Sequence, residues 1–139
     1  MTERLLALLI VAAVVAGIWG LIRLRAAWYR GREASDLLEA ARPLILAFST
    51  PDCVPCRTAQ KPALETLRQR YVGRVEVREV DATLRPELAD RFGILTVPST
   101  VVVGADGRVR AVNYGLALAD KLAVQLGLDG ASARRYRRE

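Results

Sequence analysis

An uncharged stretch near the N-terminus limits how this chain can fold. Residues 5–22 read LLALLIVAAVVAGIWGLI and contain no charged side chain. As an α-helix this stretch would span about 27 Å, close to the roughly 30 Å hydrocarbon core of a bilayer. Trp19, Trp28 and Tyr29 stand near its C-terminal end, and such rings favour the membrane–water boundary. The sequence therefore predicts one N-terminal transmembrane helix.

A cleaved secretory signal is the main alternative for this stretch. Signal peptides have a shorter apolar core behind a positive start, and they end at a cleavage site made of small residues. Here the start is weak because Glu3 offsets Arg4, and arginines and bulky aromatic residues follow the run. We therefore favour an uncleaved anchor, which together with its juxtamembrane segment comprises residues 1–30.

The distribution of positive charge predicts an orientation. The formal net charge is +6. Arg4 precedes the apolar run, whereas Arg23, Arg25, Arg30 and Arg32 follow it. Basic residues concentrate on the cytoplasmic side of a span, so we expect a single-pass protein of the cell membrane with its C-terminal domain in the cytoplasm. The margin in charge is small, and the reversed orientation would place the domain on the oxidising side.

The excess of basic residues does not indicate nucleic-acid binding. Much of it lies beside the apolar run and in the tail, residues 129–139, which includes RRYRR. Basic segments next to a membrane span contact anionic lipid headgroups. No stacking motif or recognition helix accompanies them. We expect a disordered tail, contact with the lipid membrane, and no nucleic-acid partner.

The rest of the chain predicts an α/β domain in residues 31–128. Strands are expected at 44–48, 75–80, 99–103 and 109–114, and helices at 36–41, 54–71, 86–92 and 118–126. The first strand, LILAF, is apolar throughout, as is typical of a strand buried on both faces. A strand–helix–strand start predicts a parallel pair, and a closing hairpin adds antiparallel strands. The pattern therefore predicts a mixed four-stranded sheet flanked by helices, with Pro62 kinking the second helix.

Both cysteines of the chain lie in STPDCVPC, residues 49–56. Structural zinc takes four ligands, usually cysteine and histidine. This chain has two cysteines and no histidine, so we expect no metal site. A disulfide that closes so short a loop constrains the unfolded chain very little. Reactivity is therefore the favoured explanation for the pair, and nothing in the sequence suggests an organic cofactor.

The position of Cys53 favours a reactive thiol. It follows the buried strand where a helix is expected to begin, and the N–H groups and dipole of a helix start stabilise a thiolate. Cys56, one turn later, is expected to be more buried and to act as the resolving thiol. Pro55 lacks an N–H, which the first turn of a helix tolerates. The carboxylate of Asp52 opposes thiolate formation, whereas Arg57 favours it.

From about Pro43 to Leu128 the sequence resembles the thioredoxin family. The resemblance rests on LILAFSTPDCVPCR, on the strand ending VREVDA, on RFGILTVPSTVVV, and on the hairpin ADGRV followed by Gly115. A C-x-x-C motif near a strand–helix–strand pattern is itself typical of such redox sites. The resemblance implies the thioredoxin-like three-layer fold and a thiol–disulfide oxidoreductase.

The resemblance also implies roles for individual residues. Cys53 would be the nucleophile and Cys56 the resolving cysteine. The Val97–Pro98 peptide bond would be cis and would lie opposite the cysteines, where the backbone around Val97 binds an extended substrate. The other expected site residues are Thr96 for substrate binding and Asp52, Val54, Pro55 and Arg57 for tuning the dithiol.

The sequence departs from the family pattern at positions that affect the dithiol. Asp52 stands where thioredoxins usually have tryptophan. The family's buried aspartate, which helps to deprotonate the second cysteine, aligns with Ala47, and its lysine partner aligns with Val77. The kinking proline, Pro62, stands one residue later than usual. Because the usual proton acceptor is missing, we expect slower turnover or the use of water.

The leading hypothesis is a membrane-tethered oxidoreductase that reduces or exchanges protein disulfides. Its expected partners are a disulfide-containing protein substrate and an upstream thiol reductant such as a thioredoxin reductase. Two alternatives stay open. One is a non-enzymatic thioredoxin-fold subunit or docking module of a membrane complex. The other requires the opposite topology and is an extracytoplasmic thiol donor for the maturation of cytochromes or copper proteins.

Overall fold

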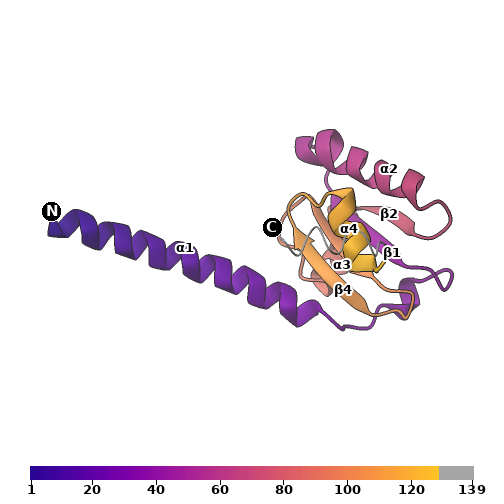
Figure 1. Ribbon diagram of the computed structural model, residues 1–139, viewed down its shortest axis with the longest axis horizontal. Helices are drawn as coiled ribbons and strands as arrows, with labels where there is room; N and C mark the ends of the chain where they lie inside the picture. The colour runs from indigo at the N-terminus through magenta and orange to yellow at the C-terminus, as the bar shows by residue number, and fades with distance from the viewer. Residues whose placement is uncertain (129–139) are drawn as a thin grey trace.

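A long N-terminal helix, α1 (Thr2–Tyr29), extends away from an α/β domain (Figure 1). This computed structural model describes residues 1–128, and the tail expected to be disordered, 129–139, lies outside the described residues. No residue of α1 is fully buried. Within the described chain, α1 is the one helix whose length and composition suit a membrane span, and a signal sequence would share these features.

The domain is built on a four-stranded sheet in the order β2–β1–β3–β4. β1 pairs with β2 in parallel and with β3 antiparallel, and β3 pairs antiparallel with β4. The strands are β1 (Leu44–Ser49), β2 (Glu76–Asp81), β3 (Ser99–Val103) and β4 (Val109–Tyr114). The mixed sheet that the sequence predicts is therefore confirmed, with each strand within one residue of its expected place.

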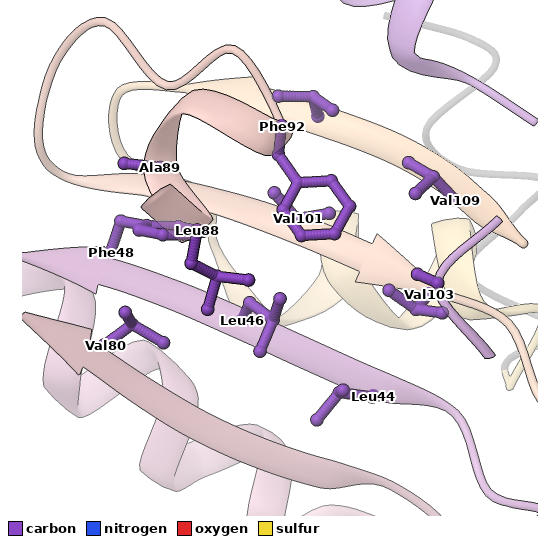
Figure 2. Packing of buried hydrophobic residues seen from close by; sticks show 12 residues of the cluster. Leu44, Leu46, Phe48, Val80, Leu88, Ala89, Phe92, Val101, Val103 and Val109 are labelled. Carbon is purple, nitrogen blue, oxygen red and sulfur yellow. The ribbon is translucent and has the colours of Figure 1, made fainter. Parts of the chain in front are cut away.

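Helices cover both faces of the sheet, which confirms the three-layer fold. The residues of β1 alternate between the faces. Leu46 and Phe48 pack with α3 (Figure 2), whereas Ile45 packs with α2 and α4. Both faces are apolar, which explains why β1 shows no polar alternation in the sequence. The three helices are α2 (Lys61–Arg70), α3 (Pro86–Arg91) and α4 (Ala119–Leu126).

The segment predicted as a single helix at 54–71 has two parts. Cys56–Gln60 forms a π-helical turn, and α2 continues from it as a regular α-helix. The wider turn precedes Pro62, which has no N–H to donate into that turn and whose ring crowds it. The kink expected from this proline therefore takes the form of a π-helical turn that begins at the second cysteine.

The short helix predicted at 36–41 was wrong. A single 3-10 turn, Ser35–Leu37, stands there instead. A helix of so few residues before Pro43 gains too few hydrogen bonds to offset its nucleation cost. The segment is held by tertiary contacts, because Leu37 and Leu38 pack against the core on the α3 face.

Backbone hydrogen bonds attach the chain after α1 to the edge of the sheet. Gly31 donates to the carbonyl of Val109 at 2.7 Å, and Val109 donates to that of Arg32 at 2.9 Å. Ala34 then donates to the carbonyl of Gly107 at 2.7 Å. Gly31, at φ +80°, allows the turn out of the helix. The segment between helix and domain therefore runs along β4 instead of forming a free linker.

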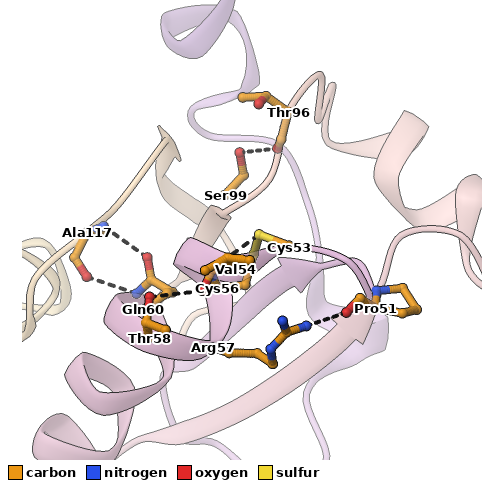
Figure 3. The surroundings of a disulfide bond; sticks show 10 residues. All are labelled: Pro51, Cys53, Val54, Cys56, Arg57, Thr58, Gln60, Thr96, Ser99 and Ala117. Atoms are coloured by element: carbon orange, nitrogen blue, oxygen red, sulfur yellow. Dashed lines mark hydrogen bonds between the residues drawn. A yellow bond between two sulfur atoms is a disulfide. The ribbon is translucent and has the colours of Figure 1, made fainter.

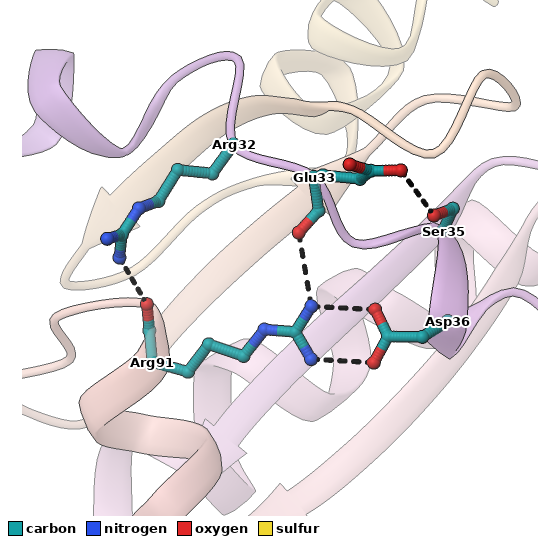
Figure 4. Close-up of polar contacts among 5 residues, drawn as sticks. All are labelled: Arg32, Glu33, Ser35, Asp36 and Arg91. Carbon is teal, nitrogen blue, oxygen red and sulfur yellow. Dashed lines mark hydrogen bonds and ion pairs between the residues drawn. The ribbon is translucent and has the colours of Figure 1, made fainter.

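Arg91 holds the same segment from α3 (Figure 4). Its guanidinium pairs with both carboxylate oxygens of Asp36, at 2.7 and 2.6 Å, and also donates to the carbonyl of Glu33. Arg32 in turn donates to the carbonyl of Arg91. The side-chain hydrogen bonds from Arg91 lower the pKa of Asp36 below its ordinary value.

The end of α1 meets the domain at Gly93. Tyr29 packs against the core on the α3 face, and a Cβ added to Gly93 would overlap its ring. The carbonyl of Gly93 accepts hydrogen bonds from Arg25, at 3.4 Å, and from the Tyr114 hydroxyl, at 2.9 Å. Burial raises the pKa of Tyr114. Helix α1, strand β4 and the loop before β3 are thus joined at one glycine.

We expect Gly93→Ala to lower the free energy of unfolding more than Gly73→Ala does. Both glycines have a positive φ, +65° and +72°, so each substitution costs about 1–2 kcal/mol through the backbone. The added Cβ at 73 meets nothing within 4 Å, whereas at 93 it displaces Tyr29. We expect a further loss of about 1 kcal/mol or more from that overlap. Urea unfolding of the full chain in detergent micelles measures both, and equal losses would contradict the packing of Tyr29 on Gly93.

Candidate active site

The two cysteines lie where the chain leaves β1 and enters the helical segment before α2. Cys53 and Cys56 form a disulfide in this structure. Their exposed fractions are 8% and 7%, so the greater burial expected for Cys56 is not observed. Both cysteines are therefore buried to a similar degree.

A backbone N–H group points at the first sulfur. Cys56 N donates to Cys53 Sγ at 3.2 Å (Figure 3). Cys53 N donates to the carbonyl of Thr50 at 3.1 Å, which closes the turn that presents the sulfur. The geometry expected from the sequence, with Cys53 at the start of a helical segment, is present. After reduction, the same N–H group would stabilise negative charge on Cys53 Sγ.

The pairing of β1 with β3 brings the proline loop to the dithiol. Phe48 pairs with Ser99, so the chain after β1 and the chain before β3 lie at the same end of the sheet. Thr50 and the pair Thr96–Val97 line one shallow pocket. The segment of the predicted substrate-binding residues therefore lies beside the loop that carries the cysteines.

The proline loop has a defined backbone. The Val97–Pro98 peptide bond is cis, as the resemblance implies. Thr96 is exposed, Val97 is half-buried and Pro98 is buried. The Ser99 hydroxyl donates to the carbonyl of Thr96 at 2.7 Å (Figure 3), and Gly115 N donates to that of Pro98 at 2.9 Å. These bonds fix the loop and leave the backbone around Val97 accessible.

The residues expected to tune the dithiol lie mostly at its surface. Asp52, Val54 and Pro55 are exposed. The guanidinium of Arg57 donates to the carbonyl of Pro51 (Figure 3), so it contacts the loop before the cysteines. The structure therefore gives Arg57 a contact with the loop backbone that the sequence did not predict.

A cavity of about 240 Å³ adjoins the second cysteine. Ala47, Cys56 and Lys61 line it, together with Glu79, which stands opposite Ala47 in the pairing of β1 with β2. Ala47 is the position of the family's buried acid. Water occupies about 30 Å³ per molecule in the liquid, so the space beside Cys56 has room for several. The cavity therefore leaves space for solvent beside Cys56.

Gln60 supports the site through contacts that the sequence does not predict. Its buried side chain donates to the carbonyl of Ala117 at 2.9 Å and accepts from Ala117 N at 3.0 Å (Figure 3). It thereby ties the turn after Cys56 to the loop before α4. A polar residue in line with Leu64 and Leu67, at helical spacing, was the available signal.

Comparisons with known proteins agree with this geometry. The thioredoxin family model matches residues 32–126. Thioredoxin C-2 of Corynebacterium nephridii is 35% identical over 89 residues, which cover 64% of this chain and 81% of the relative. Thioredoxin of Synechocystis is 30% identical over 77 residues, which cover 55% and 71%.

Solved structures show the same fold. Chloroplastic thioredoxin z aligns with a TM-score of 0.55 and 24% identity, over 63% of this chain and 77% of that one. Thioredoxin-2, a component of the malaria parasite protein secretion machinery, aligns with a TM-score of 0.53 and 21% identity, over 60% and 80%. The matched region contains the Cys53–Cys56 pair and the cis peptide bond. This chain therefore belongs to the thioredoxin family of thiol–disulfide oxidoreductases.

Proposed function

We propose that this protein is a membrane-tethered enzyme that reduces or exchanges protein disulfides through Cys53 and Cys56. The hydrogen bond from Cys56 N to Cys53 Sγ carries the proposal. It places a donor at the one sulfur that must hold negative charge before it attacks. The exposed Thr96 and half-buried Val97 then offer backbone beside that sulfur for the substrate chain.

The reaction conserves one disulfide. The Cys53 thiolate attacks a sulfur of the substrate disulfide, so a mixed disulfide forms and the other substrate sulfur leaves as a thiolate. The Cys56 thiolate then attacks Cys53 Sγ. The second substrate thiolate leaves, and the Cys53–Cys56 disulfide forms. Two electrons have passed to the substrate, and an upstream dithiol reductant of the thioredoxin reductase type returns them to the pair.

Cys56 must lose its proton before the second step. No carboxylate stands at position 47 to accept it. In our proposal, water in the cavity lined by Ala47 and Cys56 accepts this proton. Glu79 and Lys61 line the same cavity and are exposed, so they are candidates to pass the proton on to the surface.

The location proposed is the cell membrane, with α1 as a single anchor and the domain in the cytoplasm. Within this proposal residues 1–30 form the anchor and juxtamembrane segment, and residues 31–128 form the catalytic domain. Support comes from the uncharged run in α1 and from the arginines that follow it. The opposite orientation would favour the thiol donor for the maturation of extracytoplasmic proteins.

The proposed roles of the cysteines predict opposite results for two serine variants. Cys56→Ser leaves the attacking thiol but cannot resolve the adduct. We therefore expect a stable mixed disulfide with insulin or with another disulfide-containing protein. Cys53→Ser is expected to form none, although its remaining thiol is equally close to the surface. Non-reducing gels and mass spectrometry identify the adduct. If neither variant traps a substrate, and the full chain does not reduce insulin, the proposed function is wrong.

Restoring an acid at position 47 is expected to speed the reaction at neutral pH. In Ala47→Asp a carboxylate faces the cavity beside Cys56 and accepts its proton. We expect the rate of insulin reduction to rise about tenfold. This is less than the 10²–10⁴-fold typical of a general base, because in our proposal water already accepts the proton in the wild-type protein. Ala47→Asn, of similar size but without the charge, is the control. Stopped-flow insulin reduction from pH 6 to 9 measures both, and a rate equal to that of the control would contradict a limiting proton transfer.

The proposed orientation is checked by the activity of a reporter. We expect alkaline phosphatase fused after residue 128 to be inactive, and green fluorescent protein at the same place to be fluorescent, because both report a cytoplasmic C-terminus. Moving arginines from the C-terminal to the N-terminal flank of α1 should reverse both signals. The opposite pattern in the unmodified chain would favour the extracytoplasmic thiol donor.

A further inference from the structure

The domain lies alongside the C-terminal end of α1 and reaches back to the last residues of the uncharged run. Trp19 and Ile22, both in the uncharged run, line a groove with Tyr114, Lys121 and Gln125 of the domain. The Arg23 guanidinium lies 3.9 Å from the centroid of the Trp19 ring in a cation–π contact, and tryptophan is typical of the membrane–water boundary. The domain surface therefore reaches the level at which α1 would leave the hydrocarbon.

A second groove lies between α1 and the loop that precedes Thr96. It lies between Leu95 and the part of α1 from Leu21 to Tyr29, and we call it the Leu95 groove. Its volume is about 420 Å³ and its walls are predominantly apolar. Leu95 and Trp28 are 65% and 76% exposed. Contiguous exposed apolar side chains mark sites of contact with a protein or a membrane.

Leu95 also belongs to the shallow pocket that Thr50 shares with the proline loop. That pocket is lined by Thr50, Leu95, Thr96 and Val97, among others. One surface therefore runs from the end of the uncharged stretch, across Leu95, to the backbone proposed to hold the substrate. Figure 1 agrees, because the start of α2, next to the cysteines, lies on the side of the domain toward which α1 extends.

The length of α1 sets the height of this surface above the hydrocarbon. From Ile22 to Tyr29 the helix rises about 10 Å, and a headgroup region is about 5–8 Å thick on each side. The hydrogen bonds of Gly31 with β4 follow directly, so no slack separates helix from domain. With α1 in a bilayer, the dithiol would thus be held close to the headgroups.

We propose that the substrates are disulfides of membrane proteins within about 10 Å of the bilayer surface, and that the apolar juxtamembrane end of the substrate's transmembrane segment occupies the Leu95 groove. This inference rests on the proposed anchor and dithiol exchange. The groove suits a peptide better than a lipid phosphate, because its cation, Arg25, is already engaged by Gly93 and Tyr29. A substrate chain bound in the groove would continue past Leu95 and pair with the backbone around Val97. The same chain would thereby carry its disulfide to the cysteines.

The test compares two substrates with full-length Cys56→Ser protein in lipid nanodiscs. Both are single-span peptides with the same disulfide loop, placed either two residues from the apolar helix or about 37 Å away behind a stiff spacer of 12 prolines. We expect the near disulfide to form the mixed disulfide at least tenfold faster. Equal rates would overturn the inference. The wild-type protein in the same nanodiscs is assayed with insulin, and failure there would remove the proposed function and the inference together.

Substitutions in the groove test the occupant. We expect Trp28→Ser to slow adduct formation with the near substrate at least fivefold and to leave insulin reduction unchanged. Val72→Ser, at an equally exposed apolar residue (78%) after α2, is the matched control and should change neither. If Trp28→Ser leaves the rate with the near substrate unchanged but abolishes crosslinking of the groove to photoactivatable lipid, the groove binds lipid and the inference is wrong.

Discussion

The burial of β1 on both faces is the constraint on which the rest of the structure depends. Its alternating side chains fill the core under α3 and the core under α2 and α4. Its neighbours, β2 and β3, are fixed by pairing along its length. Because β1 ends at Ser49, the cysteine turn and the proline loop must both emerge at that end of the sheet. The site is therefore a consequence of how one apolar strand is enclosed.

The same burial accounts for the unusual chemistry beside the second cysteine. Position 47 faces the core under α2 and α4, with Ile45 and Leu64 in the same cluster. A carboxylate there is costly unless it is hydrogen-bonded. With Ala47 the strand stays apolar, and the cavity next to Cys56 stays open to water. The chain thus has a less interrupted core than a protein with an acid at this position, and in the proposed function water takes the place of that acid.

The sequence predicted the features that are local or periodic. The apolar run of β1, the hairpin before β4 and the C-x-x-C at a strand end each have a signal within a few residues. The resemblance added the cis bond at Pro98. Long-range contacts had no such signal: the bonds of Gln60 with Ala117 join residues far apart in the chain, and so does the packing of Tyr29 on Gly93. The 3-10 turn at Ser35–Leu37 belongs to the same class, because Arg91 and the core hold it more than its own propensity does.

The hydrogen bonds between Gly31, Arg32 and Val109 have a consequence for the search for a substrate. With a flexible tether the dithiol could reach any point within the length of the tether from the bilayer. The effective concentration of any target would then fall as the tether became longer. In the proposed membrane-anchored protein, a stiff joint instead confines the dithiol to a thin layer parallel to the membrane. Diffusion then occurs in two dimensions, and targets are sorted first by their height above the lipid and only afterwards by their sequence.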